Sequence, residues 1–97
     1  MTDNLKELAM ALFLTDLGYK KIGTPPEILD LMQSKLEQAT QRLAGAGILV
    51  DETEPADVDL LVCYAAWLYR GRVNQQAMPV QLRRVLRERQ ADGLLRR

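Results

Sequence analysis

Few side chains in this 97-residue sequence could transfer protons or act as nucleophiles at neutral pH. The chain has no histidine, the residue that most often moves protons near pH 7 and most often binds metal ions. Its single cysteine, Cys63, has apolar neighbours that raise the pKa of a thiol, so we expect a small core residue. Nothing directs two carboxylates such as Glu27 and Asp30 into one pocket, and both suit the first turn of a helix. We therefore predict no catalytic residue, and a protein that is not an enzyme.

The acidic stretch between residues 51 and 59 is where a metal site would first be sought. It contains Asp51, Glu52, Glu54, Asp57 and Asp59. A helix-loop-helix calcium site needs ligands at alternating positions and a glycine at its sharp turn, and this stretch has neither. The six glycines of the chain also form no phosphate-binding pattern. We predict a solvated acidic loop, and neither a metal nor a cofactor.

The charges are balanced overall but separated along the chain. Residues 1–66 contain eleven acids and five bases, whereas residues 67–97 contain eight arginines and two acids. Opposite poles can pair copies of one chain, or present a basic face to nucleic acid or to an acidic protein. The alternative is that these charges only solvate helix faces and a basic tail.

A tryptophan followed by arginines marks the start of the basic part. Trp67 lies opposite the aliphatic stripe of its expected helix, and Arg70 and Arg72 follow it. Tryptophan and arginine are enriched at the energetic centres of protein interfaces. We predict a subunit or partner interface at Trp67, Arg70, Arg72, Met78 and Pro79. Tyr69 points round the helix from Trp67, and we expect it in the core.

Two helices are predicted in the first half of the chain. Apolar residues at helical spacing predict a helix from about residue 4 to 17, which Gly18 ends. Its apolar stripe consists of Leu5, Leu8, Leu12 and Phe13. Thr24 is the expected N-cap of the second helix, with Pro25 at its first position and its end at Gly45 or Gly47. Its apolar stripe consists of Leu29, Met32, Leu36, Ala39 and Leu43.

A third helix, opened by Pro55, is apolar on nearly all sides. One face carries Val58, Leu61, Val62, Ala65 and Leu68, and much of the other carries Leu60, Cys63, Tyr64 and Trp67. Either this helix is the centre of a bundle, or its second face meets another subunit. Residues 47–50 before it are expected to form a loop that tucks its aliphatic side chains into the core.

Pro79 suits the first position of a fourth helix. Its apolar stripe is Leu82, Val85 and Leu86, and Arg83, Arg84 and Arg87 lie on the opposite arc. We expect these arginines to contact an acidic partner or a DNA lumen. The predicted fold is all-α, a small bundle of about four helices with the third at its centre. Residues 1–90 form one helical domain, and residues 91–97 form a flexible basic C-terminal tail.

No membrane segment is expected. The longest uncharged run, residues 60–69, is about half of what a bilayer-spanning helix needs. The first residues lack the basic start and the small-residue cleavage site of a secretory signal. We therefore expect a cytoplasmic protein.

Several short segments occur in an order that is typical of one family. The series runs through Ala39, Gly47-Ile48, the acidic loop, the 64–69 segment with Arg72, Met78-Pro79 and Leu82-Arg83. Over residues 5–90 it resembles the head–tail connector (head-completion) proteins of long-tailed bacteriophages. The resemblance implies a helical subunit that forms a ring of many copies, about twelve, beneath the portal protein. Such a ring extends the DNA channel and seats the next neck or tail protein.

The resemblance also implies where the protein acts. It would be made in the host cytoplasm during assembly and remain in the virion neck, where DNA passes through the lumen without sequence-specific binding. The alternative is a small helical nucleic-acid-binding module that uses the arginines of the fourth helix. The sequence has no recognisable helix-turn-helix or zinc module for reading bases.

Overall fold

A computed structural model of the chain describes residues 3–19, 23–74 and 77–95. Within these residues the chain forms the helices α1 (Asp3–Leu17), α2 (Pro26–Gly45), α3 (Pro55–Asn74) and α4 (Val80–Leu95). The predicted all-α class is therefore confirmed. α4 continues through Leu95, past the boundary at residue 90 that was expected between the domain and its tail.

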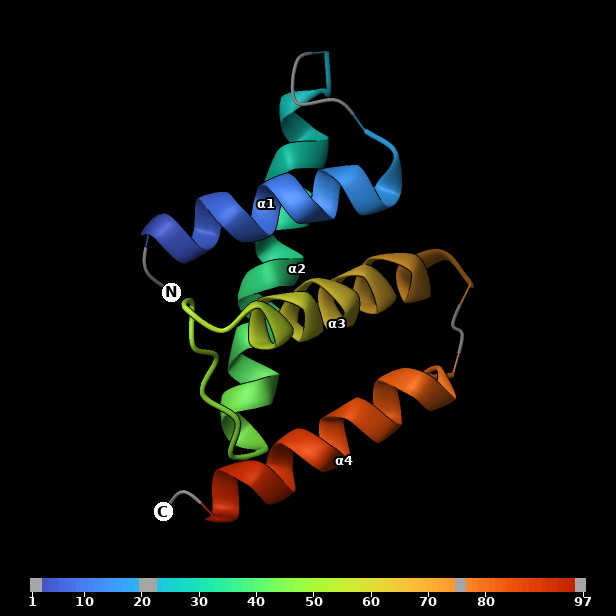
Figure 1. The fold of residues 1–97 in the computed structure, drawn as a ribbon. Helices are drawn as coiled ribbons and strands as arrows, with labels where there is room; N and C mark the ends of the chain where they lie inside the picture. The colour runs from blue at the N-terminus through green and yellow to red at the C-terminus, as the bar shows by residue number, and fades with distance from the viewer. Residues whose placement is uncertain (1–2, 20–22, 75–76, 96–97) are drawn as a thin grey trace.

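The helices are arranged in two layers (Figure 1). α1, α3 and α4 lie side by side, and α2 crosses behind α1 and α3 and ends near the C-terminal part of α4. α3 packs against each of the other three described helices, which confirms its predicted place at the centre. The molecule is flattened, with extents of 44 × 30 × 18 Å, so much of each helix stays near the surface.

Glycines in the left-handed region end the first two helices. Gly18 has φ of 80° and Gly47 has φ of 87°, and such angles cost an L side chain about 1–2 kcal/mol. The turn at Gly47 lets the Ile48 N–H donate to the Leu43 carbonyl oxygen at 2.8 Å. The predicted ends at Gly18 and Gly45 are thus confirmed.

The start of α2 differs from the prediction by one residue. Pro25, not Thr24, is the N-cap, with φ of −58° and ψ of 144°, and the helix begins at Pro26. The reason is steric, because a residue that precedes a proline is disfavoured in the helical region. Pro26 therefore keeps Pro25 extended.

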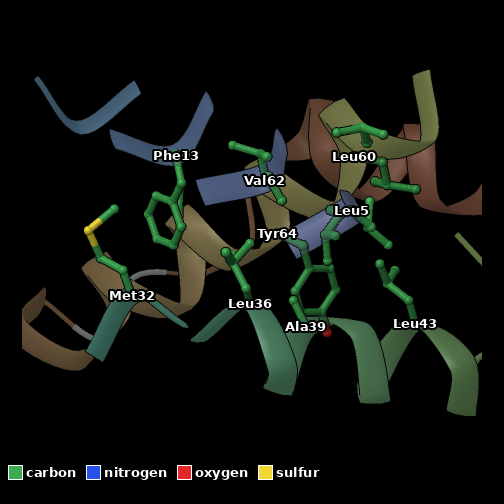
Figure 2. Close-up of a cluster of buried hydrophobic side chains, with 14 of the residues drawn as sticks. Leu5, Phe13, Met32, Leu36, Ala39, Leu43, Leu60, Val62 and Tyr64 are labelled. Atoms are coloured by element: carbon green, nitrogen blue, oxygen red, sulfur yellow. The ribbon is translucent and has the colours of Figure 1, made fainter. Parts of the chain in front are cut away.

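The core lies where α1 and α3 cross α2 (Figure 2). Phe13, Met32, Leu36, Leu43 and Leu61 are fully buried there. Ala39 and Ala65 are also fully buried. Small residues at such positions let helix backbones approach each other closely. The second face of α3 is covered in part, since Leu60 and Tyr64 are buried.

Some residues predicted to be buried are exposed. Leu8 and Leu12 are 42% and 41% exposed, because α1 turns Leu5, Ala9 and Phe13 toward the core instead. No described helix covers the other side of α1.

The loop after α2 is only partly tucked into the core. Ile48 is buried and Val50 packs against the core, as predicted, but Leu49 is 77% exposed. The reason is the turn at Gly47, which directs Ile48 back toward the last turn of α2.

Candidate functional site

The site begins with a groove between α3 and α4, which we call the α3–α4 groove. It has a volume of about 650 Å³. Its apolar wall consists of Leu60, Cys63, Ala66, Trp67, Pro79, Leu82 and Val85. Its polar lining consists of Asp16, Asp59, Arg70, Gln81, Arg84 and Glu88. Four residues of the predicted interface and arginine stripe are thereby brought together: Trp67 and Arg70 from α3, Arg84 from α4, and Pro79 from the position before α4.

Trp67 is fixed from one side and open on the other. Its ring meets the ring of Tyr64 edge to face, with centroids 5.7 Å apart and an interplanar angle of 88°. It is half-buried and packs against the core, while its remaining surface lines the groove. A large aromatic ring held in one orientation can bury a partner's apolar group at little entropic cost.

Arg70 forms an ion pair beside Trp67. Its Nη2 lies 3.3 Å from Oδ2 of Asp16 on α1, and both side chains are about half exposed. Exposed pairs of this kind contribute about 0–1 kcal/mol. A partner carboxylate could therefore replace Asp16 at little cost in stability.

Cys63 is exposed in the groove, and its predicted place in the core is wrong. It lies on the outward side of α3, where α4 does not cover it. Burial against the helix raises the pKa of the thiol, the negative charges of Asp59 and Asp16 raise it further, and Arg70 offsets part of this. The predicted direction of the pKa is thus confirmed, and the thiol is a poor nucleophile at neutral pH.

The other predicted site residues lie apart from the groove or outside the described part. Met78 is half-buried and packs against the core. Arg72 lies in the last turn of α3, and its side chain is outside the part that the structure describes. Arg83 and Arg87 are exposed on the outer side of α4, away from the groove.

Val85 was predicted to face the core but is 42% exposed. It lies instead on the groove wall, because α4 rests on α3 through Leu82 and the half-buried Leu86. The burial of α4 is therefore confined to a narrow strip.

The sequence analysis missed the polar contact that holds the far end of α4. Arg89 Nε lies 2.7 Å from Asp57 Oδ1, and Arg89 Nη2 lies 3.1 Å from Oδ2. The same guanidinium donates to the Leu49 carbonyl oxygen at 3.2 Å. The exposed fractions of the two side chains are 15% and 5%. Arg89 follows Leu82 by seven residues and Leu86 by three, so its place on the buried strip was the available signal.

This contact sets the ionisation of both partners. Burial alone would raise the pKa of Asp57. The hydrogen bonds from Arg89 and from the Asp51 N–H lower this pKa, the positive charge of Arg89 lowers it further, and the result lies below the usual value of an aspartate. The hydrogen bond to Asp57 raises the pKa of Arg89. The two residues are therefore a charged pair at neutral pH.

The described residues offer little other chemistry. Among the described residues, no group of three histidine, cysteine, aspartate or glutamate side chains is placed to hold a metal ion. None of the described helices is long and apolar enough to cross a membrane. Comparisons with known family models, with curated proteins and with solved structures found no match for this chain.

Proposed function

We propose that this chain is a structural subunit that forms a ring beneath a bacteriophage portal, extends the DNA channel and joins head to tail. The α3–α4 groove is the observation that carries the proposal, because it exposes Trp67, Arg70 and Val85 on a mixed apolar and charged surface. Such surfaces bind protein segments through an aromatic anchor and a charged rim. The resemblance in residues 5–90 supplies the particular assembly.

The chemistry of the described groups favours binding over catalysis. The raised pKa of Cys63 keeps its thiol protonated, and Asp57 is held by Arg89. We therefore propose a protein that acts by contact with further copies of itself, with a portal protein and with the next neck or tail protein.

Mixing the purified chain with portal rings and imaging the product by electron microscopy tests this proposal. We expect an added ring on the portal. Val85→Glu, on the groove wall, should reduce docking by about tenfold or more. Leu49→Glu is the matched control, since Leu49 is exposed and lies outside the groove. A chain that stays monomeric and ignores the portal would contradict the proposal.

A second candidate function is nucleic-acid binding through α4. Arg83, Arg84 and Arg87 are exposed and form no ion pair with any described residue. Phosphate contacts of three arginines would make the affinity fall steeply with salt. Replacing all three by glutamine separates the candidates: lost DNA binding with intact assembly favours a DNA contact, and lost assembly favours a protein interface.

A further inference from the structure

A second groove lies between α3 and α1, adjoins the α3–α4 groove at Asp59, and is called the acceptor groove here. It has a volume of about 500 Å³ and is lined by Leu8, Leu12, Glu52, Pro55, Ala56, Val58 and Asp59. Leu8 and Leu12 are more than two-fifths exposed, although they lie side by side on one face of α1. Two adjacent leucines left in water form an apolar floor that another surface could cover.

The rim of the acceptor groove is acidic. Glu52 and Asp59 line it, and Glu54 is exposed in the same loop. Asp59 and Glu54 form no ion pair with any residue that the structure describes. No basic residue lines this groove among the described ones. A partner for it must therefore be apolar in part and positively charged.

The outer face of α4 has that character. Val80, Arg83 and Arg87 follow the spacing of one helical face, and Arg84 lies at the border between this face and the α3–α4 groove. All four side chains are exposed. Val80 is 76% exposed at the start of the helix. The inner strip of α4 is already engaged by Leu82 and Arg89, so the outer face is what remains for a partner.

One copy of the chain cannot join these two surfaces. α4 lies beside α3 on the side away from α1 (Figure 1), so its outer face points away from its own acceptor groove. A contact between different patches on two copies is heterologous, and repetition of it gives a closed ring or an open filament. The separation of eleven acids in residues 1–66 from eight arginines in residues 67–97 fits such a contact.

We propose that the acceptor groove of one copy binds the outer face of α4 of a second copy, with Val80 on the leucines and the arginines on the acidic rim. The inference rests on the self-assembly in the proposed function and names the two surfaces that meet. It also assigns Arg83 and Arg87 to a protein contact rather than to a DNA lumen.

Disulfide trapping between singly substituted chains tests the contact. In a Cys63→Ser background, Leu12→Cys and Val80→Cys chains of different tag length are mixed under mild oxidation at low salt. We expect the mixed dimer and neither homodimer, and a ladder or a closed ring when both cysteines are in one chain. Ser34→Cys, exposed on α2, is the control and should not cross-link to Val80→Cys.

Charge reversal gives an independent readout by sedimentation. Arg83→Glu with Arg87→Glu should weaken self-association by about tenfold or more. Mixing that chain with one that carries Glu52→Arg and Glu54→Arg should restore it, because neither of these residues lines the α3–α4 groove. The Arg42→Glu control on α2 should leave association unchanged. The restored pair would show that the two surfaces meet, which mere loss of folding cannot do.

The outcomes separate this inference from the function on which it rests. Assembly with portal but without the mixed Leu12–Val80 cross-link would overturn the contact and leave the ring proposal standing. Self-association that survives the arginine reversal while DNA retention is lost would overturn it in favour of a nucleic-acid surface. If no cross-link forms at any concentration, the proposed contact is wrong. The ring proposal then depends on the portal experiment alone.

Discussion

At the scale of single residues, the Asp57–Arg89 pair holds the last helix to the rest of the molecule. Its two short hydrogen bonds join α3 to α4 across 32 positions of sequence. Asp57 also accepts from the backbone of Asp51, at 3.0 Å, so one carboxylate ties the acidic loop and two helices together. Removing one member of such a buried pair leaves the other charge without a partner.

The Asp57→Asn substitution should lower the free energy of unfolding at pH 7 by about 2–3 kcal/mol. Because the fold lowers the pKa of Asp57, the stability that the pair supplies is complete above the unfolded pKa, about 3.9, and is lost as pH falls through the folded value. The variant should therefore lose less stability than the parent chain between about pH 5 and pH 2.

Urea unfolding across that pH range, followed by circular dichroism, measures both effects. Asp30→Asn is the matched control, because Asp30 is an exposed carboxylate near the start of α2. It should cost less than about 1 kcal/mol. If the free energy of unfolding changed with pH by the same amount in the parent chain and in Asp57→Asn, the pair would not couple folding to protonation.

At the scale of elements, the helices are well delimited and unequally attached. α1, α2 and α3 share the buried core, whereas α4 reaches it through Leu82 and rests on the strip around Leu86 and Arg89. α4 is thus the element with the least buried apolar surface, and its outer face is free to meet a partner. In a single copy of the chain, the attachment of α4 to α3 therefore depends on the contact between Arg89 and Asp57.

The turn after α2 offers a matched pair of glycine substitutions. Gly47→Ala should lower the free energy of unfolding by about 1–2 kcal/mol, because its φ of 87° strains an L residue. Gly45→Ala should instead raise it by about 0.5–1 kcal/mol, since Gly45 is helical and an added methyl group there meets nothing within 4 Å.

Chemical unfolding of the two variants beside the parent chain measures the difference. The comparison isolates backbone conformation, since the same atoms are added two residues apart. Equal effects at both positions would mean that the left-handed turn does not direct Ile48 into the core.

At the scale of the whole molecule, apolar side chains remain exposed that a larger protein would bury in its core. The chain is only 18 Å thick in its smallest extent, and grooves lined by leucines or tryptophan lie beside α3. Acidic residues predominate around the acceptor groove, and arginines lie on the outer face of α4. The proposed head-to-tail contact rests on these two surfaces, because a heterologous contact needs two different patches on each copy.

Self-association should weaken as ionic strength rises. The two proposed surfaces carry opposite charges near the solvent, and the Debye length falls from about 30 Å at 0.01 M salt to about 10 Å at 0.1 M. Sedimentation velocity over this range, at constant protein concentration, should show the oligomer fraction decreasing. Association that strengthens with salt would indicate that apolar contacts alone drive it.

Periodicity and turn chemistry, which are local, were enough to predict most elements of the fold. Proline and glycine positions predicted the starts of α2, α3 and α4 and the ends of α1 and α2 to within about two residues, whereas α4 continues past the expected end at residue 90. The all-round apolar pattern that begins at Pro55 identified the central helix. Trp67, predicted to face away from the aliphatic stripe, is half-buried and lines the α3–α4 groove, and its role in an interface stays a prediction. The apolar neighbours of Cys63 in the sequence were enough to predict that the pKa of its thiol is raised.

Only the tertiary structure decided which apolar side chains are buried and which charged side chains form pairs within one subunit. Leu8, Leu12, Val85 and Cys63 fit a core by pattern but are exposed, because no other described helix covers those sides of α1, α4 and α3. Arg89 resembles its neighbours in sequence but is the one described α4 arginine that pairs with Asp57. A helical period fixes which residues share a face, whereas the packing of other helices fixes which face is covered.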